Sequence, residues 1–197
     1  NGNPVAGVGV TFAVASGGGS ATGLSATSDA NGIATVGSWT LGLTAGGNTL
    51  TATSAGLTGS PLTFNATGTA GPASTMTLSA GDAQSATVGN AVAIAPAVLV
   101  RDANNNPVSG VSVTFSVIAG GGSVVGGTAT TNASGIASVT SWTLGTTAGT
   151  NTLRATSAGL TGSPIDITAT GTASAATQIA LNAGDGQSAV AGSAVTT

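Results

Sequence analysis

The side chains that could perform chemistry are few in this sequence. Of its 197 residues, seven carry a charge: Arg101, Arg154, Asp29, Asp82, Asp102, Asp166 and Asp185. His, Cys, Lys, Glu and Tyr, which supply most general bases and activated nucleophiles, do not occur. Two carboxylates could still act as a pair, but the aspartates fall in separate predicted turns and strands. The sequence therefore predicts no catalytic residue, no cofactor and no enzymatic activity.

The best candidate for a metal site is the oxygen-rich run from Asp102 to Asn106, to which Asp82 or Asp185 could add a ligand. Calcium takes about six to eight oxygen ligands, generally with several carboxylates, whereas this run holds a single carboxylate. Asp and Asn also favour turns, because their side chains hydrogen-bond to nearby backbone groups. We therefore interpret the run as a turn and predict no metal site. Asp102, Asn104 and Asp82 are kept as weak candidates for calcium ligands.

The charge and the apolar runs exclude two classes of partner. A formal net charge of −3 with only two arginines provides no basic surface for nucleic acid. No apolar run approaches the roughly 20 residues that a membrane-spanning helix needs. The sequence has no cysteine, so no disulfide reinforces the fold. We therefore expect neither a nucleic-acid partner nor a membrane span in this segment.

A long internal repeat organises the chain. The stretch from Trp39 to Pro61 returns from Trp142 to Pro164, 103 positions later, and the last ten residues of the two stretches are identical. The same spacing relates Phe12 to Phe115. A fixed period of this length is typical of similar structural units arranged in a row.

Each repeat has the pattern of short strands separated by turns. Over residues 111–117, Val and Phe alternate with Ser and Thr, which indicates a strand with one buried face. Asn132-Ala133-Ser134-Gly135 predicts a hairpin turn with the glycine at positive φ, and a shift of phase between Val139 and Trp142 predicts a bulge. Seven to nine such strands predict an antiparallel β-sandwich of about 100 residues. The large side chains expected in its core are Trp39, Trp142, Phe12 and Phe115.

The period divides the chain into one complete unit and two incomplete ones. We expect residues 73–175 to form a complete domain, residues 1–72 a partial domain without its opening strands, and residues 176–197 the opening strands of a third. Two explanations are open. The sequence is a window on a longer covalent array, as the missing initiating Met favours. Alternatively, separate chains join head to tail and 176–197 completes 1–72 of the next by strand addition, although the equivalent of 95–103 is then missing.

Three motifs recur in the same order in both copies: Asn-Pro-Val-x-Gly-Val-x-Val-x-Phe at 3–12 and 106–115, Asn/Asp-Ala-x-Gly-Ile-Ala at 29–34 and 132–137, and Trp-Thr-Leu-Gly at 39–42 and 142–145. Together they resemble the bacterial Ig-like domains of the invasin/intimin group. The resemblance implies an all-β fold of tandem Ig-like antiparallel β-sandwiches in a linear array. It also implies an extracellular or cell-surface bacterial protein. Many members are surface adhesins in which such domains form a stalk. Nothing in this sequence resembles their receptor-binding tip domains.

These observations favour a structural role, as repeats of an extracellular stalk or filament that serves adhesion or matrix architecture. The expected partners are neighbouring Ig-like repeats, in the same chain or head to tail. Two alternatives are open. The domains could themselves bind a host or cell-surface receptor or a glycan, which an exposed aromatic cluster would favour. They could also be Ig-like domains of a phage virion protein.

Overall fold

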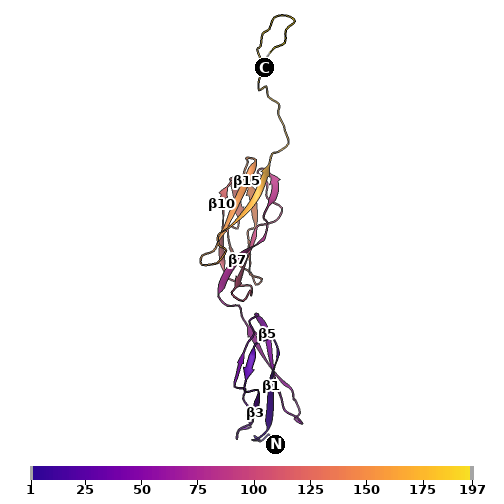
Figure 1. Ribbon diagram of the computed structural model, residues 1–197, viewed down its shortest axis with the longest axis vertical. Helices are drawn as coiled ribbons and strands as arrows, with labels where there is room; N and C mark the ends of the chain where they lie inside the picture. Colours follow the sequence, from indigo (N-terminus) through magenta and orange to yellow (C-terminus); the bar gives the residue numbers. More distant parts are fainter. Residues whose placement is uncertain (1, 196–197) are drawn as a thin grey trace.

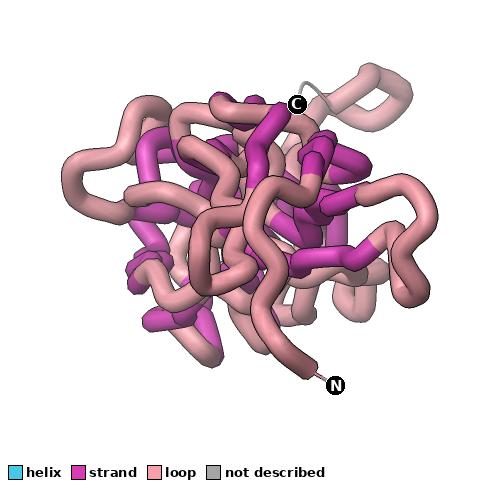
Figure 2. The backbone as a smooth tube through the Cα atoms, turned by 90° about the horizontal axis from the view of Figure 1, so that it is seen from below, coloured by secondary structure: helices cyan, strands magenta, loops and turns pink. Residues whose placement is uncertain are grey.

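The computed structural model describes residues 2–195, and within them the chain forms sixteen β-strands and no helix (Figures 1 and 2). The strands gather into two units that lie end to end along the long axis of the molecule (Figure 1). We call residues 9–68 the first unit and residues 73–172 the second unit. Because no helix is present in the described range, no helical segment there could cross a membrane.

The first unit is built from six strands in two antiparallel sheets. The strands are β1 (Gly9–Ser16), β2 (Ser20–Thr22), β3 (Ser25–Thr27), β4 (Ser38–Thr40), β5 (Gly46–Thr53) and β6 (Leu62–Gly68). One sheet has the order β3-β1-β5-β6, and the other pairs β2 with β4. The long strands alternate polar and apolar residues, as expected for a sheet with one face exposed to solvent. In the described residues, β6 is an edge strand of its sheet.

The second unit has ten strands in three sheets. They are β7 (Ala73–Ala80), β8 (Gln84–Thr87), β9 (Ala97–Asp102), β10 (Ser112–Ala119), β11 (Gly122–Val125), β12 (Thr128–Thr130), β13 (Ile136–Ser138), β14 (Ser141–Leu144), β15 (Gly149–Thr156) and β16 (Ile165–Thr172). The sheets have the orders β12-β10-β15-β16-β8, β13-β9-β7 and β11-β14. Only β8 and β16 run parallel. This arrangement is the antiparallel sandwich that the sequence predicts.

The sequence repeat is also a repeat of strand pairing. Phe12 pairs with Ala52 between β1 and β5, and Phe115 pairs with Ala155 between β10 and β15. Every strand of the first unit has a counterpart 103 positions later in the second unit. Four strands of the second unit, β7, β8, β9 and β13, have no counterpart in the first. The positions that match β7–β9 would precede residue 1, and the positions that match β13 form no strand.

The core of the second unit lies between its five-stranded sheet and the β13-β9-β7 sheet. Trp142 is 0% exposed, and Phe115, Met76, Val98 and Ile167 are buried in the same cluster. Met76 and Val98 come from the β13-β9-β7 sheet and Phe115 and Ile167 from the five-stranded sheet, so each sheet covers the apolar face of the other. Trp142 is added by β14 of the β11-β14 sheet. Burial of such large apolar surfaces is the main free-energy gain of a domain of this size.

Among the described residues, the first unit has no such second layer, and its large side chains are less covered. Phe12 is buried, but Trp39 is only half-buried. This differs from the expectation that Trp39 is buried in its own unit as Trp142 is. The physical reason is the missing counterpart of the β13-β9-β7 sheet, since β13 pairs with β9 in the second unit through Ile136 and Leu99.

One local feature of the second unit differs from the predicted pattern. The phase shift between Val139 and Trp142 is a change of sheet rather than a bulge, because β13 pairs with β9 whereas β14 pairs with β11. Strand β9 begins at residue 97, directly after Pro96. Pro96 has no N–H for a ladder, and its Cα lies so near Gly81 that a side chain at Gly81 would clash. The hairpin turn that ends at Gly135 has the predicted positive φ, 73°.

The last residues form no strand in the part of the chain that the structure describes. Residues 173–195, which we call the terminal segment, extend away from the second unit on the side opposite the first (Figure 1). Their large apolar side chains, Ile179, Leu181, Val190 and Val195, are exposed. That residues 176–197 are the opening strands of a third domain therefore stays a prediction. Residues 196 and 197 lie outside the described range.

The difference between the two tryptophans predicts different costs of truncation. Trp142→Ala should lower the free energy of unfolding by about 3–5 kcal/mol, because it leaves a cavity in a closed core. Trp39→Ala should cost less, about 1–2 kcal/mol, because less of the side chain leaves water. Chemical unfolding followed by circular dichroism measures both. A loss below about 1 kcal/mol for Trp142→Ala would contradict the core assignment.

Candidate functional site

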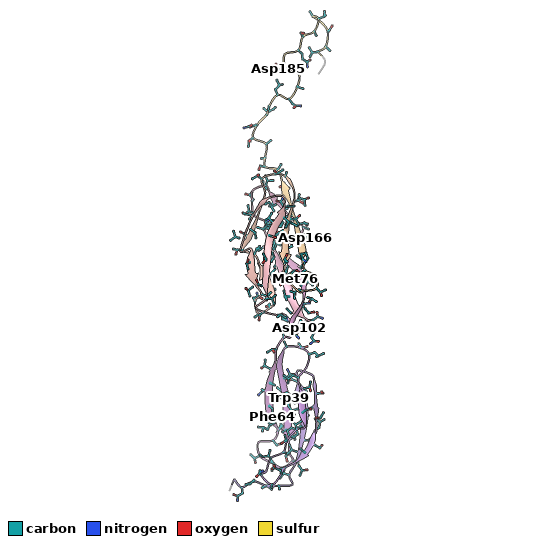
Figure 3. All side chains as sticks on the ribbon, turned by 90° about the vertical axis from the view of Figure 1, so that its left-hand side faces the viewer. Trp39, Phe64, Met76, Asp102, Asp166 and Asp185 are labelled. Carbon is teal, nitrogen blue, oxygen red and sulfur yellow. The ribbon has the colours of Figure 1, made fainter. Side chains whose placement is uncertain are left out.

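The ionisable residues do not form a common site. Asp102 ends β9 beside the boundary between the units, Asp166 lies on β16, and Asp185 lies on the terminal segment (Figure 3). Asp82 follows β7 at the end away from Asp102, roughly 25 Å along the strand. No group of three or more acidic, His or Cys side chains that could hold a metal occurs among residues 2–195. The structure thus separates the two aspartates that were the calcium candidates.

Asp102 is the centre of a hydrogen-bond network at the boundary between the units. Its Oδ1 accepts hydrogen bonds from the backbone N–H groups of Asn104 and Asn106, each at 2.8 Å. Its Oδ2 accepts from the N–H of Gly71 at 2.8 Å and from Nδ2 of Asn106 at 2.9 Å. The side chain is nearly enclosed, with 3% of the residue exposed. A buried carboxylate is stable here because four donors replace its lost water.

Asn106 carries this network across the boundary. Its Nδ2 donates to the carbonyl oxygen of Leu43 at 2.8 Å, and its Oδ1 accepts from the N–H of Ala45 at 2.8 Å. Leu43 and Ala45 belong to the connection between β4 and β5 of the first unit. Asp102 therefore orients the side-chain amide of Asn106, and that amide hydrogen-bonds to the backbone of the first unit. We call Asp102, Asn106, Gly71 and the 43–45 connection the junction.

The same donors set the charge state of Asp102. The amide of Asn106 is the largest influence, and with the N–H groups of Gly71, Asn106 and Asn104 it lowers the pKa of Asp102 to about 2, against the opposing effect of burial. Asp102 is therefore ionised at neutral pH. Its lone pairs already face N–H groups, whose positive ends would repel a cation. The geometry thus favours a structural carboxylate over a calcium ligand.

Two other aspartates also connect neighbouring parts of the second unit. Oδ1 of Asp82 accepts from the N–H of Thr168 at 2.8 Å and from its Oγ1 at 2.9 Å, and the N–H bond is the main reason that the pKa of Asp82 is lowered. Asp166 pairs with Arg154 on the neighbouring strand, with Nε and Oδ1 2.7 Å apart. That pair is on the surface, where an ion pair contributes little to stability. Asp82 and Asp166 thus have separate structural contacts and do not form a common site with Asp102.

Sequence reasoning treated Asn104 and Asn106 alike, as turn residues, and missed the contact that Asn106 makes with the first unit. Only the backbone N–H of Asn104 contacts Asp102, and the Asn104 side chain is exposed. A signal was present, since Asn106-Pro107 has the counterpart Asn3-Pro4 in the first unit. A turn alone does not require the same residue at that position in both copies.

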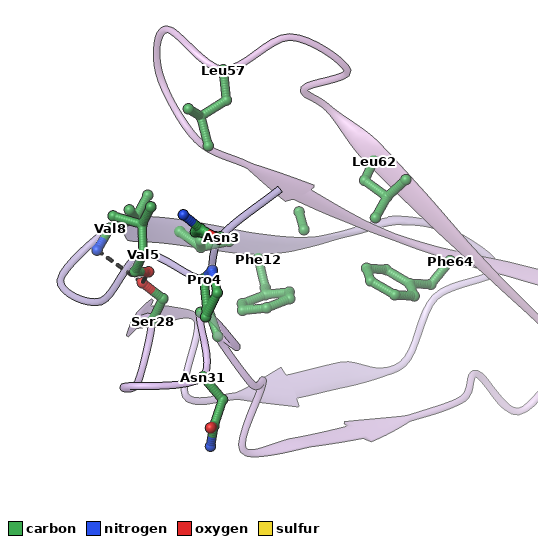
Figure 4. A pocket seen from close by; sticks show the side chains of 14 residues that line it. Asn3, Pro4, Val5, Val8, Phe12, Ser28, Asn31, Leu57, Leu62 and Phe64 are labelled. Carbon is green, nitrogen blue, oxygen red and sulfur yellow. Dashed lines mark hydrogen bonds between the residues drawn. The ribbon is translucent and has the colours of Figure 1, made fainter. Parts of the chain in front are cut away.

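A second feature is an open apolar face on the first unit (Figure 4). A hollow of about 520 Å³ lies there, and we define the apolar face by five of the side chains that line it: Val10, Phe12, Leu57, Leu62 and Phe64. One wall is held by Ser28, whose Oγ donates to the carbonyl oxygen of Val5 at 2.8 Å and accepts from the N–H of Val8 at 3.0 Å. Ser28 thus fixes the 5–8 segment beside the hollow, and the five side chains that define the face are apolar.

In the second unit the equivalent positions are covered. Phe64 is 42% exposed, whereas its counterpart Ile167 is fully buried. Leu57 is exposed, whereas its counterpart Leu160 is buried. The cover is the β13-β9-β7 sheet with Met76. The apolar face is therefore the inner face of a sandwich without its second layer.

Comparison with protein families identifies the second unit. Residues 75–170 match the family model of the bacterial Ig-like domain, group 1. Residues 75–170 are thus similar to bacterial Ig-like domains of group 1. The match spans almost all of β7–β16, so both main sheets of the sandwich belong to it. The resemblance to invasin/intimin-type repeats and the expected all-β, Ig-like fold are confirmed. No curated protein matched the sequence.

Two solved structures, FdeC and InvD, agree with this fold. An adhesin of Escherichia coli, FdeC, is 21% identical over 87% of this chain and 55% of its own, with a TM-score of 0.61. InvD of Yersinia pseudotuberculosis is 21% identical over 91% of this chain and 52% of its own, with a TM-score of 0.59. The D0-D1 domains of intimin are 26% identical over 85% of this chain and 81% of their own, with a TM-score of 0.37. The chain spans about half the length of the FdeC and InvD chains.

Calcium should not be needed for the stability of this Ig-like chain, since the oxygens of Asp102 are already occupied by N–H groups. Thermal melts recorded with calcium and with a chelator are expected to coincide. A ligand that binds only the native state must raise its melting temperature. A large drop on chelation would therefore contradict this prediction.

Asp102→Asn should destabilise the junction at neutral pH, because an amide places a donor against the N–H groups of Gly71 or Asn106. The folded pKa of about 2 lies below the ordinary value of about 3.9. The stabilisation by Asp102 is thus complete above about pH 4 and is lost as pH falls through about 2. The gap in melting temperature between wild type and variant should narrow over that range. Asn104→Ala is the control and should change nothing, because the Asn104 side chain makes no bond to Asp102.

Proposed function

We propose that this chain is a structural segment of an extracellular bacterial stalk or filament that serves adhesion or matrix architecture. In this proposal, residues 1–72, 73–175 and 176–197 belong to successive Ig-like repeats. The observation that carries it is the junction, in which the Asn106 amide makes two hydrogen bonds to the first unit. A protein that only needed two independent domains would not require bonds across their boundary.

The short connection between the units supports a rigid, rod-like arrangement rather than two domains joined by a flexible linker. Strand β6 ends at Gly68 and β7 begins at Ala73, and the N–H of Gly71 within this connection is bound by Asp102 at 2.8 Å. A tethered connection of this length leaves little freedom for one unit to swing against the other. The units consequently extend in one line, as a stalk requires (Figure 1).

The family points to the same setting. The bacterial Ig-like domain family and its FdeC neighbour, an adhesin, support a role in surface adhesion or in a stalk that presents an adhesin. We infer a location on the bacterial surface or outside the cell, with neighbouring repeats as the main partners. Direct binding of a host receptor or glycan is the rival. The half-buried Trp39 and the exposed Phe64 line one hollow, but their counterparts Trp142 and Ile167 are core residues, so a missing layer explains their exposure.

A rigid junction predicts different effects from two equivalent asparagines. Asn106→Ala removes both bonds to the first unit and should let the two units reorient independently. Asn3→Ala alters the same motif at the end of the first unit away from the second and should leave their relative orientation unchanged. Residual dipolar couplings measure this, because units that move together share one alignment. Independent alignment of the two units in the wild-type chain would contradict the rod.

The stalk proposal also predicts that these units act as a spacer. Replacing them in the parent protein by an unrelated rigid Ig-like pair of equal length should preserve bacterial adhesion. Removing them without replacement should reduce it. The soluble 197-residue chain should not compete with adhesion, and competition by that chain would favour receptor or glycan binding instead.

A further inference from the structure

The second unit is entered and left by the chain at opposite ends. The chain enters through β7, on the side of the first unit, and leaves through β16 at the far end (Figure 1). The strands of this unit run roughly along the long axis of the molecule (Figure 1). A pull on the two ends of the chain is therefore directed along the strands, and contacts between neighbouring strands have to resist it.

Strand β8 links the entering part of the chain to the leaving part. It follows β7 and lies parallel to β16, with Gln84 opposite Ala169 and Thr87 opposite Thr172. Once a pull draws β7 off its partner β9, it acts directly on the start of β8, while the opposite pull acts on the end of β16. The two strands then have to slide past each other. Because the hydrogen bonds between them lie across the strands, all of these bonds are loaded together.

The ladder between β8 and β16 is short, with four residue pairs, and further bonds reinforce it at both ends. At its start, Oδ1 of Asp82 accepts from the N–H and the Oγ1 of Thr168, at 2.8 and 2.9 Å. At its end, the N–H of Val88 donates to the carbonyl oxygen of Thr172 at 2.9 Å. The Oγ1 of Thr172 donates to the carbonyl oxygen of Ala86 at 3.2 Å. Sliding must therefore break more bonds than the ladder alone provides.

Gln84 holds β8 to a second neighbour. Its Nε2 donates to the carbonyl oxygen of Ile94 at 2.8 Å, and its Oε1 accepts from the N–H of Ile94 at 2.8 Å. The segment around Ile94 is itself fixed, because the N–H of Val92 donates to the carbonyl oxygen of Trp142 at 2.9 Å. Trp142 lies in the closed core. Strand β8 is consequently bound to β16 on one side and to a core-anchored segment through Gln84.

We propose that β8 and β16, together with the side chains of Asp82 and Gln84, form a mechanical clamp that keeps the second unit folded under tension. The chain has no cysteine, so no disulfide limits its extension, and the load falls on these hydrogen bonds. This inference rests on the proposed stalk only for the source of the tension. The resistance itself is a property of the second unit and can be measured without any adhesion assay.

Single-molecule pulling of the 197-residue chain by its two ends tests the clamp. The length gained identifies the unit that unfolds, because residues 73–172 release up to about 340 Å and residues 9–68 up to about 200 Å. Unfolding under force is governed by the unfolding rate. At a fixed force, Asp82→Ala should raise the unfolding rate of the second unit about fivefold or more, because two hydrogen bonds of the clamp are lost. Asp82→Asn keeps an Oδ1 acceptor and should restore most of the resistance.

The chain offers a matched control for Asp82→Ala. Oδ1 of the exposed Asn132 accepts from the N–H groups of Ser134 and Ile136, at 2.9 and 3.1 Å. Asn132→Ala thus also removes two hydrogen bonds to one exposed side-chain oxygen, but in a turn outside the sliding strands. It should lower stability in chemical unfolding and leave the unfolding rate under force unchanged. Equal acceleration of unfolding under force by the two variants would overturn the proposal.

The direction of pulling provides a second test. Because the sequence has no cysteine, two introduced cysteines define where the handles attach. Asn90→Cys and Ala173→Cys, at exposed positions, place both handles beyond the same end of the clamp, where a pull peels β8 from β16 one pair at a time. The second unit should then unfold at a much lower force than when it is pulled end to end. Equal forces in the two directions would refute the clamp.

The clamp and the stalk fail in different experiments. Low resistance that is independent of direction, in a chain that still acts as a spacer, would overturn the clamp and leave the stalk in place. Competition of the soluble chain with adhesion would contradict the stalk, whereas the effects of Asp82→Ala and of pulling direction on the unfolding force would still decide the clamp.

Discussion

The packing of the β13-β9-β7 sheet against the five-stranded sheet is the interaction on which the second unit depends. Met76 on one sheet and Ile167 on the other are buried because the two sheets cover each other, and Trp142 of the β11-β14 sheet joins the same core cluster. The first unit is a natural comparison, since it has nearly the same sequence in its remaining strands but not the second layer. There, Trp39 is half-buried and the counterpart of β13 forms no strand. Loss of one layer therefore affects both the burial of the core and the pairing of strands within the other.

The chain has few charged residues, and in the structure two of its aspartates bind backbone N–H groups. Asp102 and Asp82 each accept several hydrogen bonds that fix a connection in the fold. Such bonds are directional, whereas apolar packing between the units would leave their relative rotation poorly defined. In a protein with so few ionisable groups, a carboxylate at the boundary is an efficient way to specify one orientation. The side chain that contacts the first unit is the neutral amide of Asn106, so no charged side chain is needed for that contact.

The sequence by itself determined the fold class and its organisation. The 103-residue period, the alternation over 111–117 and the glycine at position 135 predict the repeated sandwich and its hairpin, because these signals act over a few residues of chain. Only the tertiary structure decided which residues work across the boundary. Asn106 and Asn104 are indistinguishable as turn residues, and Trp39 has the same local sequence as Trp142. Their different roles depend on which strands lie opposite, and contacts between residues distant in sequence are not encoded in local pattern.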